Sequence, residues 1–303
     1  MPNPADHAST PLAPVLAIVT PARGEARYLL EWIAYHRALG IDTFLIADNG
    51  GDDNTSELLQ ALDRLQLVKR FDWRKKIKFQ LQFYCEALNF ARDFADGLFL
   101  IDADEFLRPQ GHASISDIAR TWLSDPTVGA VALNWAIYGS AGRQRHDDGL
   151  VIERFTRRAP QEFSANKHAK TFVRVGSCAA PAENPHAVTL STGRYVNTRG
   201  EDVRWDTSHG HLVGITETVV WDVLRVDHFI LKSREEFEAK RARGRLITPM
   251  QDGDWQAYYA FHDRNEVEEP MPVELVQRTK REIDLITQKL HVEEYVGFSP
   301  TEG

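Results

Sequence analysis

Residues 98–106 read Leu98-Phe99-Leu100-Ile101-Asp102-Ala103-Asp104-Glu105-Phe106, so a short apolar run leads directly into three carboxylates. The apolar part is typical of a strand that is buried on both faces of a parallel sheet. Four apolar residues cannot offset three nearby negative charges, so we expect the acids where the strand leaves the core, in water or against a cation. Mg²⁺ or Mn²⁺ suits such oxygen ligands and commonly also binds substrate phosphates. An acidic surface turn is the alternative.

Segments with strand character alternate with segments with helix character before this run. Strands are predicted at 15–20, 43–47, 67–71 and 98–101, and helices at 25–39, 54–65 and 79–94. Residues 21–24 are expected to break the first strand, and Gly40 is placed to end the first helix. This alternation predicts an α/β fold with a mostly parallel sheet flanked by helices.

Polar groups follow three of these strands, at residues 20–25, 48–53 and 102–105. Ligands of open α/β sheets bind outside the carboxyl ends of the strands, so we expect the three groups to converge at one edge, under a nucleotide. The first strand is not followed by G-x-G-x-x-G, and the chain has no G-x-x-x-x-G-K-[ST]. A dinucleotide-binding fold and a P-loop kinase are therefore not supported.

Composition is that of a globular protein. Of the 303 residues, 43% are hydrophobic and 26% charged, and the net charge of −8 gives no reason to expect a nucleic-acid partner. Cys85 and Cys178 are too few for a disulfide framework, which predicts a reducing, cytoplasmic location. Residues 1–13 are expected to form a flexible tail without a signal core, and no stretch is long enough to span a membrane. A peripheral contact with the cytoplasmic membrane face stays open.

Several motifs occur in an order that resembles glycosyltransferase family 92 and the related family 2 enzymes. They are Ala17-Ile18-Val19-Thr20, Glu25, residues 28–36, Gly40, Asp48-Asn49-Gly50, Gln80, residues 101–106, Trp135, Tyr138-Gly139, Lys170, His186 and residues 228–233. The resemblance covers residues 15–245. It departs from the family pattern at Gly24, where relatives often carry Asn before the glutamate.

This resemblance implies a Rossmann-related GT-A domain over residues 14–245, followed by a C-terminal helical extension over 246–303. It implies a metal-dependent, inverting glycosyltransferase of the hexosyltransferase class, which takes a sugar from a UDP-sugar or other nucleotide-sugar donor. The acceptor would be a hydroxyl of a glycan or glycolipid, as in polysaccharide biosynthesis. Asp102 and Asp104 would form a DXD motif that binds Mn²⁺ or Mg²⁺, with His228 completing the metal shell. His228 follows a strand predicted at 219–226 and precedes a helix that Ser233 and Glu236 could cap as an S-x-x-E box. A structural histidine with its hydrogen bonds satisfied is the alternative for His228.

The donor would be bound by residues near the strand ends, namely Thr20, Arg23, Glu25, Asp48, Gln80, Asp102 and Lys170. Asp48 could instead form an Asx turn, and Glu25 could be a first-turn helix residue. Two basic clusters could contact the diphosphate or an anionic acceptor, or be solvated faces. They are Lys69, Arg70, Arg74, Lys75, Lys76 and Lys78, and Lys240, Arg241, Arg243 and Arg245.

Inverting transfer needs a base that takes the proton of the attacking hydroxyl. Of the acids Asp147, Asp148 and Glu153, we choose Asp148 and Glu153 as the candidates. Trp135 and Tyr138 could stack on the acceptor sugar, and a surface hairpin would explain the same loop. The alternatives for the chain as a whole are a GT-A-type nucleotidyltransferase and a non-catalytic sugar-nucleotide-binding or scaffold protein. The sequence does not name the donor sugar, the acceptor, the metal or the oligomeric state.

Overall fold

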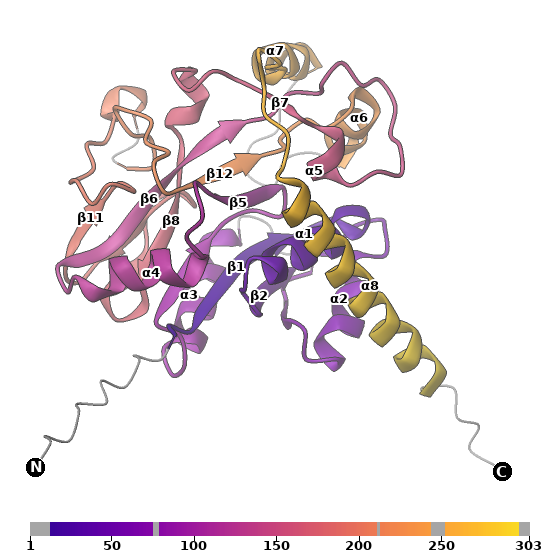
Figure 1. Cartoon of the computed structure of the whole chain (residues 1–303), viewed down its shortest axis with the longest axis horizontal. Coiled ribbons are helices and arrows are strands. Elements are labelled where there is room, and N and C mark those ends of the chain that lie inside the picture. Colours follow the sequence, from indigo (N-terminus) through magenta and orange to yellow (C-terminus); the bar gives the residue numbers. More distant parts are fainter. Residues whose placement is uncertain (1–12, 75–78, 211–212, 244–251, 297–303) are drawn as a thin grey trace, which may run out of the picture.

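The computed structural model describes residues 13–74, 79–210, 213–243 and 252–296 (Figure 1). One nine-stranded sheet has the order β3-β2-β1-β4-β8-β6-β12-β5, with β11 paired to β6. Its strands are β1 (Leu16–Ala22), β2 (Thr43–Asp48), β3 (Lys69–Asp72), β4 (Gly97–Leu100), β5 (Glu105–Pro109), β6 (Val128–Ile137), β8 (Ala169–Arg174), β11 (Arg194–Val196) and β12 (Leu224–His228). Two short pairs lie outside it, β9 (Cys178–Pro181) with β10 (Val188–Leu190), and β7 (Arg157–Arg158) with β13 (Val267–Glu268).

The helices are α1 (Ala26–Ala38), α2 (Thr55–Arg64), α3 (Gln80–Ala91), α4 (Ile115–Ser124), α5 (Val151–Arg154), α6 (Arg234–Arg243), α7 (Asp252–His262) and α8 (Val273–Val296). Three short 3-10 turns lie at Ser164–Lys167, Val175–Ser177 and Thr207–His209. None of the described helices has both the length and the apolar character that a membrane span needs.

The sheet is mostly parallel, as predicted. β3, β2, β1 and β4 are parallel neighbours, whereas β8 and β5 run against their partners. Alternate residues of β1 face opposite sides: Ile18 packs in the cluster that contains Trp32 of α1, while Val19 packs in the cluster that contains Phe83 of α3. The predicted α/β fold with a helix-flanked, mostly parallel sheet is confirmed.

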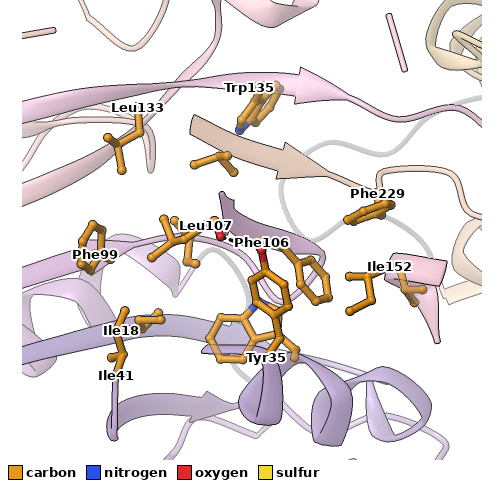
Figure 2. Packing of buried hydrophobic residues seen from close by; sticks show 14 of the residues in the cluster. Ile18, Tyr35, Ile41, Phe99, Phe106, Leu107, Leu133, Trp135, Ile152 and Phe229 are labelled. Atoms are coloured by element: carbon orange, nitrogen blue, oxygen red, sulfur yellow. Dashed lines mark hydrogen bonds between the residues drawn. The ribbon is translucent and has the colours of Figure 1, made fainter. Parts of the chain in front are cut away.

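Helix α1 ties the sheet to the start of β5, directly after the acidic segment. Trp32 Nε1 donates to the carbonyl of Glu105 at 2.7 Å, and the Tyr35 hydroxyl donates to the carbonyl of Leu107 at 2.8 Å. Figure 2 shows Tyr35 pointing toward Phe106 and Leu107. His36 Nε2 accepts from the Leu107 amide, and burial lowers the pKa of this histidine to about 3, so it packs as a neutral ring. The first helix therefore holds the backbone that carries the acids.

Three element boundaries differ from the sequence prediction. β1 continues through Pro21 to Ala22, because beyond Val19 only β2 pairs with it and no amide hydrogen is needed on the β4 side. The predicted strand at 219–226 is β12 at Leu224–His228, which makes His228 its last residue. β5 was not predicted: Glu105 starts a strand, whereas the sequence placed all three acids in a loop.

The segment after residue 251 packs against the rest of the chain. In Figure 1, α8 runs along α1, and Arg37 of α1 pairs with Glu282 of α8 at 2.9 Å. β13 extends the contact by pairing with β7. The proposed domain boundary at residue 245 stays a prediction.

A buried carboxylate of α1, Glu31, holds the start of α5. Its two oxygens accept from the amides of Val151 at 2.8 Å and Ile152 at 3.1 Å. Burial raises the pKa of Glu31 to about 7, although both hydrogen bonds and Arg154 act in the opposite direction. The charged form is therefore disfavoured in the folded protein relative to the unfolded chain.

This shift predicts a pH-dependent difference between the wild type and Glu31→Gln. A carboxyl whose pKa is raised on folding binds more protons when folded, so its contribution to stability falls as pH rises from about 4.5 to about 7. The variant should lose stability at pH 4 through its altered amide contacts, and this deficit should shrink by up to about 3 kcal/mol at pH 7.5. Urea unfolding of both proteins across this range measures it; a constant deficit would contradict the raised pKa.

Candidate functional site

A cavity of about 280 Å³ lies at the carboxyl ends of β1 and β4. Its lining combines polar and aromatic side chains. Its polar lining includes Arg23 and Glu25 after β1, Gln80 at the start of α3, Asp102 and Asp104 after β4, His186, His228 at the end of β12, and Lys240 of α6. Its aromatic lining is Trp135, Phe237, Trp255 and Tyr258. The position at the strand ends is the one predicted for a ligand site.

The loop after β2 packs against the loop after β1, as expected from the topology. The Gly24 amide donates to the Gly50 carbonyl at 3.0 Å, and a Cβ on Gly51 would lie 2.7 Å from the Gly24 nitrogen. The Glu25 amide donates to the Thr55 hydroxyl at 2.7 Å. These contacts fix the backbone that presents Arg23 and Glu25 to the cavity.

Asp102 is held by two side chains. One oxygen accepts from Lys170 Nζ at 2.8 Å and the other from Gln80 Nε2 at 3.0 Å. Lys170 is fully buried and also lies 3.6 Å from Glu105. Burial alone would lower the pKa of Lys170, but the two carboxylates raise it above its usual value. The lysine therefore stays charged beneath the acids.

Asp104 lies between a lysine and a histidine. Oδ2 accepts from Lys240 Nζ at 2.7 Å, and Oδ1 is 3.4 Å from His228 Nε2. Burial would raise the pKa of Asp104, but Lys240 and His228 hold it well below its usual range. Burial lowers the pKa of His228, against the effect of Asp104. The pair is thus an ionised carboxylate beside a neutral imidazole.

Glu105 is the innermost of the three acids and is fully buried. Its Oε2 accepts from the Asp102 amide at 2.8 Å. Burial raises the pKa of Glu105, whereas the positive charge of the buried Lys170, 3.6 Å away, acts to lower it and favours the carboxylate. Glu105 therefore lies behind the cavity rather than in its lining.

Trp135, which lines the cavity, packs against three histidines. Its ring stacks on His168 with centroids 4.8 Å apart and meets the edges of His186 at 5.2 Å and His228 at 4.4 Å. His186 Nδ1 lies 3.1 Å from the Ala169 carbonyl, which can only accept, so Nδ1 carries the hydrogen and Nε2 keeps its lone pair. Burial, followed by Lys170, lowers the pKa of His186 well below its usual value, so this ring is neutral.

The structure brings together most of the predicted site residues. Those that line the cavity are Arg23, Glu25, Gln80, Asp102, Asp104, Trp135 and His228. Lys170 lies directly behind Asp102. The S-x-x-E capping box predicted after His228 is also present: the Ser233 amide donates to Glu236 at 2.9 Å, and the Glu236 amide donates to the Ser233 hydroxyl at 3.3 Å.

Three proposed donor and acceptor contacts fall elsewhere. Thr20 is fully buried, with its hydroxyl 3.4 Å from the Pro21 carbonyl. The buried Asp48 accepts from Arg70, Ser56 and the Gly50 amide, which is the Asx-turn alternative. Tyr138 is buried and does not line the cavity, so it is not placed to stack on an acceptor sugar. Its hydroxyl accepts a hydrogen bond from Arg108 at 2.9 Å in the core.

The two predicted bases do not reach the cavity either. Asp148 is exposed on the loop before α5, and Glu153 pairs with Lys280 of α8 at 2.6 Å. Neither lies among the residues that line the cavity. Glu31 binds the amides at the start of α5, the helix that follows this loop. The structure therefore places Asp148 and Glu153 outside the lining of this cavity.

Of the two basic clusters, only the second contributes a described residue to the lining of the cavity. Arg70 binds Asp48 and Arg74 binds Asp72, whereas Lys240 lines the cavity and binds Asp104. Lys75, Lys76, Lys78 and Arg245 lie outside the described residues. The sequence alone gave no individual role to Lys240, His186, Trp255 or Tyr258. No local pattern marks these four, because distant elements bring them to the acids.

The residues around Asp104 fit a divalent metal ion through their chemistry. Within the described ranges no group of three or more His, Cys, Asp or Glu side chains could hold a metal. Asp104 Oδ1 and His228 Nε2 nevertheless face one another as an ionised oxygen donor and a neutral nitrogen donor, a combination that suits Mn²⁺. Ions of this kind often take only one or two protein ligands and complete their shell with waters and substrate phosphates.

Fold and cavity together define an open-sheet α/β protein with a polar site at the carboxyl ends of its strands. Residues 19–174 match the glycosyltransferase family 92 domain. The chain therefore belongs to glycosyltransferase family 92, and the resemblance seen in its motifs is confirmed.

Relatives in two plants carry the same family name. A family 92 protein of Oryza sativa subsp. japonica is 27% identical over 252 residues, which cover 79% of this chain and 41% of the relative. A family 92 protein of Arabidopsis thaliana is 29% identical over 136 residues, covering 42% of this chain and 24% of the relative. The chain thus spans less than half the length of these relatives. Among solved structures, S. aureus TarS in complex with UDP aligns with a TM-score of 0.36 and 10% identity, over 53% of this chain and 47% of that one.

Proposed function

We propose that the chain transfers a sugar from a nucleotide-sugar donor, with UDP as the nucleotide, to a hydroxyl of a glycan or glycolipid. Membership in family 92 supports glycosyl transfer. The observation that carries the proposal is the cavity at the strand ends, where Asp102, Asp104, His228 and Lys240 meet. Anionic ligands with a bound cation suit such a site.

The donor end of the cavity would be the side next to β1 and β4. Arg23, Glu25 and Gln80 line it there, and the nucleotide would lie over these strand ends. Lys240 supplies a positive charge at Asp104, where it would also attract a diphosphate. Asp104 and His228, with Asp102 beside them, would hold a divalent ion. That ion would stabilise the negative charge of the departing diphosphate.

The acceptor would enter along the aromatic residues of the lining. Trp135, Trp255 and Tyr258 offer flat faces for a sugar ring, and the last two come from α7. We assign the base to His186, which packs against Trp135 and has Nδ1 bound to a carbonyl and the lone pair of Nε2 available. A base on the side opposite the leaving diphosphate gives inversion of the anomeric centre.

Replacing His186 with asparagine should therefore lower turnover by about 10²-fold or more while UDP affinity changes little. The side chain lies beside Trp135 rather than against the acids, so the donor end keeps its shape. Release of UDP from the donor and UDP binding are measured on the same variant. His112→Asn, an exposed histidine outside the cavity, is the matched control. Equal losses of turnover and UDP affinity would contradict the role as base.

The proposed activity is tested by screening nucleotide sugars for thermal stabilisation with and without Mn²⁺. A ligand at 100 times its dissociation constant stabilises the folded state by about 2.7 kcal/mol, which a melting curve detects. A UDP-sugar should stabilise the protein, and more so with Mn²⁺. The sugar that does so is then incubated with candidate glycan acceptors. Stabilisation by nucleoside triphosphates alone would instead support a nucleotidyltransferase.

A further inference from the structure

Two buried polar atoms in the site face one another without a hydrogen bond. Glu105 Oε1 and His228 Nδ1 both lack a partner in the described part of the chain, and they lie 3.8 Å apart. Glu105 is fully buried and His228 is 5% exposed. Leaving a buried polar atom without a partner typically costs about 1–3 kcal/mol, so two that face one another require an explanation.

The sheet itself places these side chains opposite one another. β5 and β12 are antiparallel, and Glu105 and His228 are direct partners in their register. Side chains in such positions project from the same face and touch. The other carboxylate oxygen is fixed by the Asp102 amide, and Trp135 packs edge-on against the imidazole. A small movement of the imidazole is enough to close the remaining gap.

The other ring nitrogen of His228, Nε2, lies 3.4 Å from Oδ1 of Asp104, the other proposed metal ligand. A histidine that binds a metal through one nitrogen usually donates its other N–H to a carboxylate or carbonyl, which fixes the ring and its tautomer. We infer that Glu105 is a positioning residue: it accepts a hydrogen bond from His228 Nδ1 and so directs Nε2 toward a divalent ion beside Asp104. This inference rests on the metal-dependent function proposed above.

The hydrogen bond from the Asp102 amide makes Glu105→Gln a sharp test. That amide needs an acceptor, so the carbonyl oxygen of the new glutamine has to take the place of Oε2. The glutamine NH₂ then faces His228 and donates into Nδ1. This puts the imidazole hydrogen on Nε2, the atom that would bind the metal. The variant thus keeps the size of the side chain and reverses the tautomer.

Two measurements that do not use turnover follow. Mn²⁺ titrations monitored by electron paramagnetic resonance, at a fixed saturating UDP concentration, should show an affinity about 10- to 100-fold lower for Glu105→Gln. In a His228→Gln background the same substitution should have no further effect, because it acts through the imidazole. ¹⁵N NMR of the metal-free protein should show the His228 hydrogen on Nε2 in Glu105→Gln.

Glu31→Gln is the matched control, since it changes another buried carboxylate away from the cavity and should leave Mn²⁺ affinity unchanged. If Glu105→Gln does not fold, Glu105→Asp decides, because it keeps the charge and withdraws the carboxylate from His228; Mn²⁺ affinity should still fall. Wild-type affinity in either folded Glu105 variant overturns the positioning role. A His228→Gln variant with wild-type affinity, or a wild type that binds no Mn²⁺, overturns the proposed metal site itself.

Discussion

Asp104→Asn is expected to weaken Mn²⁺-dependent binding of UDP by about 100-fold or more. Loss of a residue that only hydrogen-bonds to a metal ligand already lowers metal affinity by up to about 100-fold, and Asp104 would be a ligand itself. Asp104 is the carboxylate that faces both His228, at 3.4 Å, and Lys240, at 2.7 Å. An amide there cannot supply the negative charge that a divalent ion requires, and it also releases the lysine. UDP affinity at a fixed Mn²⁺ concentration measures the effect.

The control for this variant is Asp117→Asn, which changes an exposed acid in the first turn of α4. It should leave UDP affinity unchanged. Melting temperatures of both variants separate a lost ligand contact from a lost fold, because Asp104 also pairs with the partly buried Lys240. Undiminished Mn²⁺-dependent affinity in a folded Asp104→Asn variant would remove Asp104 from the site.

Lys170→Met is expected to destabilise the protein by about 1–3 kcal/mol, the usual cost of leaving a buried polar group without its partner. Lys170 is fully buried and lies 2.8 Å from Asp102 and 3.6 Å from Glu105. Without it, two carboxylates are left close together with no cation beneath them. Urea unfolding at pH 7 measures the change.

Lys280→Met provides the comparison, since Lys280 pairs with Glu153 at the surface. Exposed pairs of this kind contribute at most about 1 kcal/mol. A loss for Lys170→Met no greater than that for Lys280→Met would show that Lys170 does not hold the acids together.

The sequence predicted the first half of the fold from local patterns. Apolar runs and turn residues place β1, α1, β2, α2, β3, α3 and β4 within a few residues of their observed bounds, because each pattern is complete within one element. The second half depends on long-range pairing. β8 is inserted antiparallel between β4 and β6, and no short stretch of sequence encodes which strands it joins.

The candidate site divides in the same way. Asp102 and Asp104 are recognisable because three acids after an apolar strand conflict with burial, and the conflict lies in one segment. His186, Lys240 and Trp255 reach the cavity only through the packing of distant elements. Tyr138 was expected to stack on the acceptor sugar, but its hydroxyl accepts a hydrogen bond from Arg108 in the core, a contact between residues that are far apart in the sequence.

Calorimetric titration of the wild-type protein with UDP, in Mn²⁺ and in EDTA, tests the central claim most directly. Asp102, Asp104 and His228 gather at the strand ends, where they would hold a divalent ion next to the diphosphate. We expect UDP to bind in Mn²⁺ and not to bind in EDTA. Equal UDP affinity under the two conditions would contradict the metal-bridged site.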